Sequence, residues 1–175
     1  QKRTLTLVSC FLLSHSIHNQ QRREIKMAYV SQEDKKELSV GIKRVLKKYN
    51  VKGTIGVHHR STIVVRLRSG DLDILGNYWE GYTKRVERGQ IGTHLIRTEK
   101  PTYLDVNHHS VDSTYTGEVL NFFNELIAEM KGKDFFDETD IMTDYFHCSH
   151  YLNIEVGHYT NEKPYIYNGE LAKVA

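Results

Sequence analysis

Histidine is the residue type in this chain best suited to binding a metal, and the sequence contains ten of them. Zinc sites need ligands that converge at defined spacing. The pairs His58–His59 and His108–His109 are adjacent, so on a strand each pair points to opposite faces. There is no HExxH motif and no CxxC pair. We therefore predict no metal site and no cofactor, and interpret the following as surface or structural histidines: His58, His59, His94, His108, His109, His147, His150 and His158.

Aspartates near predicted strand ends suggest a second chemistry, because nucleases gather such carboxylates around Mg²⁺. Turns and helix caps also use aspartate for purely structural reasons, which is the simpler interpretation. The chain has no Gly-rich phosphate loop or nucleophile elbow, and Cys148 lies in an apolar alternation typical of a buried thiol. The residues of a metal-dependent hydrolase would come from Asp71, Asp73, Asp105, Asp112, Asp140 and Asp144.

A basic hairpin supplies the third group of candidate functional residues. The segment from Lys52 to Arg68 contains no acidic residue. If Arg66 and Arg68 share an outward face with His58, they form a strip that could contact phosphates. The alternative is a solvated strand face that discourages pairing at a sheet edge. The candidate binding residues are Lys52, His58, Arg60, Arg66 and Arg68.

An aromatic segment follows the hairpin in the sequence. Tyr78, Trp79 and Tyr82 are candidate contact residues, and they could supply the base stacking used by proteins that bind single strands.

Periodicity predicts the elements that must position these residues. Ser31 and Asp34 form a capping-box pattern ahead of a helix whose apolar residues recur from Leu38 to Tyr49. Asn50 and Gly53 end this helix. Residues 52–70 alternate as a hairpin broken near residues 59–61. Its inward face is Ile55, Val57, Ile63, Val65 and Leu67, and its outward face is His58, Thr62, Val64, Arg66 and Arg68.

The second half of the chain is less regular. Residues 72–75 are predicted as a short strand, residues 76–100 carry only a weak helical pattern, and residues 102–106 alternate as a strand. An amphipathic helix over residues 119–130 ends at Gly132. A long strand is predicted over residues 143–156. Its inward side is Phe146, Cys148, Leu152, Ile154 and Val156, with His150 among them.

This order of elements predicts one α+β domain over residues 27–167, followed by a flexible tail over 168–175. We expect a single sheet of about four to five mostly antiparallel strands, with two amphipathic helices packed on one face. The other face would meet solvent or a partner.

Residues 1–26 have three interpretations. Gln21 to Lys26 can be encoded with an AGGAG ribosome-binding sequence ahead of Met27, which favours translated upstream DNA. A targeting segment built on residues 5–13 and a native extension are the alternatives. The segment carries net +4, so the +2 chain leaves −2 for residues 27–175, and net charge does not indicate a polyanionic partner. A single remaining cysteine and no membrane-length apolar run after Met27 favour a cytoplasmic protein.

Two separated blocks resemble a known family. Residues 27–78 read MAYVSQEDKKELSVGIKRVLKKYNVKGTIGVHHRSTIVVRLRSGDLDILGNY, and the second block is DIMTDYFHCSHYLNIEVG followed by KPY. They are similar to the N-terminal and C-terminal signatures of large polyvalent protein associated domain 29, a family of small phage and mobile-element proteins. The resemblance covers residues 27–167 with a variable middle. It implies a phage protein made in a bacterial cytoplasm, and it brings no catalytic motif.

Three functional hypotheses follow. The first is a non-enzymatic phage accessory protein that binds a host macromolecule, in counter-defence or host takeover, through the outward hairpin face and the aromatic segment. The second is a nucleic-acid-binding module that uses the basic hairpin. The third is the metal-dependent hydrolase, so an enzyme is the less favoured class.

Overall fold

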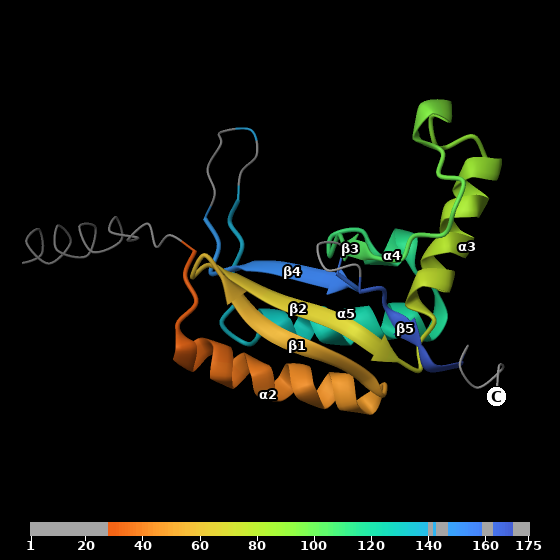
Figure 1. Cartoon of the computed structure of the whole chain (residues 1–175). Helices are drawn as coiled ribbons and strands as arrows, with labels where there is room; N and C mark the ends of the chain where they lie inside the picture. The colour runs from red at the N-terminus through yellow and green to blue at the C-terminus, as the bar shows by residue number, and fades with distance from the viewer. Residues whose placement is uncertain (1–27, 140–141, 143–146, 159–162, 170–175) are drawn as a thin grey trace, which may run out of the picture.

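A single mixed sheet organises the molecule. The computed structural model describes residues 28–139, 142, 147–158 and 163–169, so the interpretations of residues 1–26 lie outside the described residues. Five strands form the sheet in the order β1-β2-β4-β3, and β5 also pairs with β2. Helices α2 and α5 lie side by side on one face (Figure 1). The predicted α+β class, with two helices on one face of one sheet, is confirmed.

Helix α2 (Gln32–Lys48) begins where the capping-box pattern predicts. The Ser31 hydroxyl oxygen accepts the backbone N–H of Asp34 at 3.0 Å, and the Asp34 carboxylate accepts the N–H of Ser31 at 2.9 Å. After the helix, Asn50 adopts a positive φ of 51° that turns the chain into β1. The apolar stripe of α2 is buried at Ile42, Val45 and Leu46.

Strands β1 (Val51–His58) and β2 (Thr62–Gly70) form the predicted hairpin. Its turn places His59 and Arg60 at positive φ values of 50° and 57°, the combination that matches the twist of paired strands. The Arg60 carbonyl accepts the N–H of Val30 at 2.7 Å, which ties the start of the domain to the turn. The inward face follows the prediction: Ile63, Val65 and Leu67 are fully buried, and Ile55 and Val57 are partly buried against the core.

The pairing of the other strands differs from the expected mostly antiparallel sheet. Strands β4 (Tyr151–Val156) and β5 (Ile166–Tyr167) both run parallel to β2. Strand β3 (Leu104–Val106) is antiparallel to β4. The chain returns to β4 only after a long crossover through helices, which is the connection that parallel pairing requires.

Helix α5 (Gly117–Lys131) supplies the centre of the core. Phe122, Phe123, Leu126 and Met130 have no exposed surface. Phe122 meets the ring of Tyr49 edge-on, with centroids 5.4 Å apart. The helix ends at Gly132, whose φ of 68° and ψ of −176° form a backbone conformation that essentially only glycine adopts.

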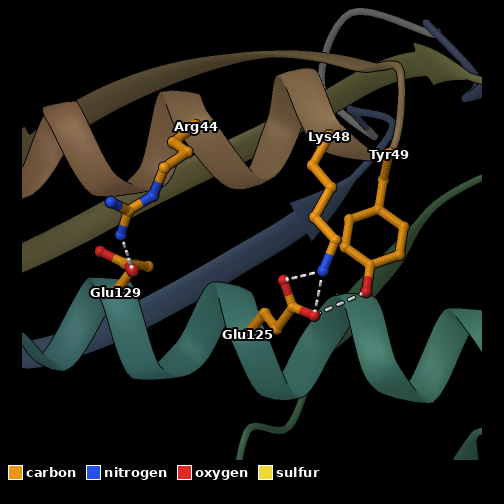
Figure 2. A network of polar contacts seen from close by, with 5 residues as sticks. All are labelled: Arg44, Lys48, Tyr49, Glu125 and Glu129. Carbon is orange, nitrogen blue, oxygen red and sulfur yellow. Dashed lines mark hydrogen bonds and ion pairs between the residues drawn. The ribbon is translucent and has the colours of Figure 1, made fainter.

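A row of polar contacts bridges the edges of α2 and α5 (Figure 2). Arg44 contacts Glu129. The Lys48 ammonium lies 2.6 and 2.8 Å from the two oxygens of Glu125, and the Tyr49 hydroxyl donates to the same carboxylate at 2.9 Å. Two basic groups of α2, Arg44 and Lys48, therefore meet acidic partners on α5.

The predicted short strand over residues 72–75 is wrong. Helix α3 (Ile74–Glu87) begins there, because the Asp73 carboxylate accepts the N–H of Gly76 at 2.7 Å and caps the helix. The apolar side chains that suggested a strand, Leu72, Ile74 and Leu75, are buried from the helix start instead. The 3₁₀ turn η1 (Thr93–Leu95) and the short helix α4 (Val111–Thr114) complete the crossover.

The predicted long strand covers residues 143–156, of which 147–156 are described. Within this described part it is shorter than expected, since β4 covers only the last six residues. Before β4, the backbone bonds to residues 136–138 instead of the sheet: Glu138 N–H donates to His147 O at 2.7 Å, and Ser149 N–H donates to Phe136 O at 3.0 Å. Cys148 and His150 are nevertheless buried as predicted. Phe146, Asp140 and Asp144 lie outside the described residues.

The end of the domain is fastened near the start of α3. The Asn168 amide donates to Asp71 at 2.7 Å, and residues 170–175 of the predicted flexible tail lie outside the described residues. Over the described part of the chain, no helix combines the length and apolar character needed to cross a membrane.

Candidate functional site

The sheet face opposite α2 and α5 carries the basic hairpin residues. Paired residues in adjacent strands point to the same face, so the register defines rows across the sheet. One row joins Thr54, Arg66 and Glu155, with Asp105 beside Glu155. Two further rows are Gly56–Val64–Asn153 and His58–Thr62–Tyr151. We call this surface the outward face, and the expected outward side of the hairpin is the one observed.

Arg66 forms an ion pair with Glu155 at the centre of the outward face. Its Nε lies 2.7 Å from one oxygen of Glu155, and its Nη2 lies 3.4 Å from the other. The other terminal nitrogen, Nη1, lies over Gly56, 4.0 Å from where a Cβ would stand. The arm of Arg66 therefore lies beside Val64, which is only 1% exposed although no helix among the described elements covers it.

Arg68 emerges at an irregularity of β2. The register between β1 and β2 shifts between Lys52 and Gly53, leaving Arg68 as the extra residue of a β-bulge. On the edge of β2 away from β1, two strands pair with β2 one after the other: β4 ends opposite Leu67, and β5 begins opposite Ser69. Arg68 thus lies in β2 at the gap between the end of β4 and the start of β5, and its side chain is exposed.

A pocket of about 310 Å³ lies at this gap. Two of its residues come from β2, four come from the connection that leads from β4 into β5, and Ile166 is the first residue of β5. Neither Arg68 nor Lys163 has an acidic partner within the described residues, whereas Arg66 is paired with Glu155. We call this the basic pocket; its lining is Arg66, Arg68, Gly157, His158, Lys163, Pro164 and Ile166.

The apolar part of the basic pocket is unusual for an exposed surface. Ile166 is 50% exposed although it lies in a strand, while the preceding Tyr165 is buried and donates its hydroxyl to Leu72 O at 3.0 Å. Tyr165 thus anchors the segment in the core, and the alternation of a strand turns Ile166 to the outward face. The result is a wall of Pro164 and Ile166 beside cationic groups.

The structure brings together part of the predicted basic strip. Arg66 and Arg68 meet at the pocket, and Lys52 lies at the same end of the hairpin, opposite Ser69. His58 lies at the other end of the hairpin and Arg60 in its turn, both exposed. Sequence patterns did not indicate His158, Lys163, Pro164 or Ile166, because only the parallel pairing of β5 with β2 places them beside Arg68.

The predicted aromatic segment has a structural role. The Tyr82 hydroxyl accepts the N–H of Arg97 at 2.6 Å and donates to Leu95 O at 3.1 Å, which fastens residues 95–97 to α3. Tyr82 is buried, and the ring of Trp79 stacks on it with centroids 5.3 Å apart. Tyr78 is half-buried and also stacks on Tyr82, with ring centroids 6.1 Å apart. These rings do not line the basic pocket.

The described histidines and Cys148 take part in local packing. His147 Nδ1 lies 3.1 Å from Glu138, and His150 Nε2 lies 2.9 Å from the carbonyl of Met130 near the end of α5. Burial lowers the pKa of His108, which packs against His109, and burial raises the pKa of the Cys148 thiol. Within residues whose positions are described, no three His, Cys, Asp or Glu side chains converge as a metal site would require.

Three of the candidate aspartates have structural partners. Asp73 caps α3, and Asp112 accepts from the Asn124 amide at 3.3 Å. Asp71 accepts from the amides of Asn50 and Asn168, and these hydrogen bonds hold the pKa of its carboxyl below the ordinary value. Asp105 lies exposed in β3, opposite Glu155 of β4.

A larger pocket of about 390 Å³ lies between the start of α2 and the end of α5. Its lining carries charges of both signs: Lys133 lies 3.4 Å from Glu37 and 4.0 Å from Asp134, and Glu129 is paired with Arg44. At the basic pocket, Arg68 and Lys163 have no acidic partner among the described residues, so we take the basic pocket as the stronger candidate site.

No protein-family model, curated protein or solved structure matches this chain. The resemblance to the phage and mobile-element family therefore stays a prediction.

Proposed function

We propose that this protein is a non-enzymatic binding protein that docks another protein on its outward face, with the basic pocket receiving an anionic group of the partner. The observation that carries the proposal is the pair Arg68 and Lys163, two cations without an acidic partner in the described chain, beside the exposed wall of Pro164 and Ile166. Protein–protein interfaces combine an apolar centre with a polar rim, and complementary charges orient the partner.

The charge of the outward face favours a protein partner over an extended polyanion. Arg66 and Glu155 neutralise each other, and Asp105 lies beside Glu155 in the same row. A nucleic-acid backbone that crossed the sheet along this row would meet a neutralised pair and the Asp105 carboxylate, which repels phosphate at close range. Cations gathered at one end of the face match a local anionic group better.

The expected setting is a bacterial cytoplasm during phage infection, and this part of the proposal rests on the family resemblance. The partner would be a host protein bound in counter-defence or takeover. The test is a pull-down from infected cells, with and without nuclease, that compares the wild type with an Arg68→Glu, Lys163→Glu double variant. The matched control is Lys36→Glu, Lys43→Glu, which reverses two exposed charges on α2.

Support requires one stoichiometric protein that survives nuclease, is lost with the pocket variant and is kept by the control. A partner that is retained equally by all three proteins contradicts the assignment of the pocket. Circular dichroism checks that both variants fold, which is expected because all four side chains are at the surface.

Nucleic-acid binding is the second candidate, because Lys52, Arg66 and Arg68 gather at one end of the hairpin. Fluorescence anisotropy with a labelled single strand tests it. Binding that weakens steeply with salt and is lost in the Arg68→Glu, Lys163→Glu variant would favour this candidate over the first. The described carboxylates lend no support to the third hypothesis, the hydrolase.

A further inference from the structure

The basic pocket has a definite charge balance. Arg66 is neutralised by Glu155, since its Nε and Nη2 both face that carboxylate at 2.7 and 3.4 Å. Arg68 and Lys163 remain, each with one positive charge that no described acidic group offsets. Among the described residues that line the pocket, the charges of Arg68 and Lys163 are therefore the two left unbalanced.

A carboxylate would offset only one of these charges. A phosphomonoester carries about −1.5 to −2 near neutral pH and offers three acceptor oxygens. Arg68 supplies a planar set of donors suited to phosphate oxygens, and Lys163 supplies a mobile point charge, the combination that recurs in phosphate recognition. The charge balance thus favours a dianionic group.

The remaining surface of the pocket is suited to an organic group. Pro164 and the half-exposed Ile166 present carbon surface beside the cations. A volume of about 310 Å³ exceeds what a phosphate alone occupies and lies at the small end of ligand pockets. One ring-sized group next to a phosphate is the class of ligand that uses both features.

We propose that the basic pocket binds a phosphomonoester, with the dianionic phosphate between Arg68 and Lys163 and its organic group against Pro164 and Ile166. This inference rests on the proposed function, because it names the anionic group that a docking partner presents. The phosphomonoester could come from a phosphorylated aromatic side chain or from a nucleotide, which share this chemistry.

Isothermal titration calorimetry of the full chain with four probes tests the inference: phenyl phosphate, benzoate, adenosine 5′-monophosphate and inorganic phosphate. We expect phenyl phosphate to bind about tenfold more tightly than benzoate, because a second charge is matched. Arg68→Gln, Lys163→Gln is expected to weaken phenyl phosphate by about tenfold or more, whereas the control Lys36→Gln, Lys43→Gln leaves it unchanged.

A second variant tests the apolar wall independently of charge. Ile166→Ser is expected to weaken phenyl phosphate by severalfold and to leave inorganic phosphate unchanged. Because Ile166 is half-exposed, the variant is expected to fold. Tighter binding of phenyl phosphate than of adenosine 5′-monophosphate assigns the source to an aromatic side chain, and the reverse order assigns it to a nucleotide.

Benzoate that binds as tightly as phenyl phosphate, or phenyl phosphate that binds equally to the wild type and the pocket variant, overturns the inference. This result is separable from the proposed function. If phenyl phosphate fails to bind as expected but the pocket variant still loses its protein partner, the proposed docking function is supported, with a carboxylate as the anionic group. If phenyl phosphate binds as expected but the partner binds the wild type and the variant equally, the phosphate site is supported and the docking function is contradicted.

Discussion

The two faces of the sheet handle positive charge in opposite ways. On the helix-covered face, Lys48 of α2 lies 2.6 Å from Glu125 of α5, and Arg44 contacts Glu129, so cations help to join elements of the fold. On the outward face, Arg66 is neutralised in the same manner, whereas Arg68 and Lys163 have no acidic partner among the described residues. A basic residue type alone therefore does not indicate a binding role in this chain, because the fold itself uses Arg44, Lys48 and Arg66 in ion pairs.

The faces should also differ in how much stability their apolar groups supply. Phe122 of α5 is fully buried, and its ring packs against the rings of Tyr49 and Phe123. Phe122→Ala is expected to lower the free energy of unfolding by about 3–5 kcal/mol, through lost transfer energy and a cavity. Urea denaturation measures the change. The control Ile166→Ser removes a half-exposed apolar group and should cost far less, and equal costs would mean that the outward face carries part of the core.

The second expectation separates the two arginines of the pocket. Arg66→Gln leaves the largely buried carboxylate of Glu155 without its charged partner, which should cost about 1–3 kcal/mol. Arg68→Gln removes an exposed cation without a partner and should stay within about 0.5 kcal/mol of the wild type. Thermal or urea unfolding measures both. A large loss for Arg68→Gln would show that this side chain maintains the bulge and is not held for a ligand.

The helix-covered face could largely be predicted from the sequence. The capping box of Ser31 and Asp34, the apolar stripe ending at Tyr49 and the alternation of β2 are local patterns, and each corresponds to the element observed. Local patterns failed where a neighbour decided the outcome. Leu72–Leu75 alternates like a strand, but one side-chain cap at Asp73 starts a helix there.

The basic pocket could be predicted only in part. Arg66 and Arg68 were found because one strand carries both. Lys163 and Ile166 lie far away in the sequence and reach Arg68 only through the parallel pairing of β5 with β2, for which the chain carries no local signal. The contact role predicted for Tyr78, Trp79 and Tyr82 stays a prediction. The sequence carried no signal for the hydrogen bonds by which Tyr82 fastens residues 95–97 to α3.

The third expectation concerns the start of α2 and its response to pH. The hydroxyl and N–H of Ser31 donate to Asp34 and hold the pKa of that carboxyl below its ordinary value. The stabilisation is therefore complete above the ordinary carboxyl range and is lost as the pH falls through the lowered pKa. Ser31→Ala should cost about 1 kcal/mol at pH 7.

Thermal unfolding at pH 7 and pH 3 checks this expectation. The difference between the wild type and Ser31→Ala should shrink at pH 3, because protonated Asp34 no longer attracts the Ser31 donors. A difference that grows on acidification would contradict the capping-box account. Arg68→Gln serves as the comparison from the outward face, where no change in the pH dependence of stability is expected.

The smallest effect is expected from the ion pairs that bridge α2 and α5. Lys48→Gln and Glu125→Gln alter exposed groups, and surface pairs contribute little because water and salt screen them. Each single variant should cost less than Ser31→Ala, and a double-mutant cycle should give a coupling that disappears in molar salt. Urea denaturation at low and high salt measures it. A coupling energy between Lys48 and Glu125 that survives molar salt would mean that ion pairs, as well as the apolar core, stabilise the helix-covered face. The main difference between the two faces would then be whether their cations are paired.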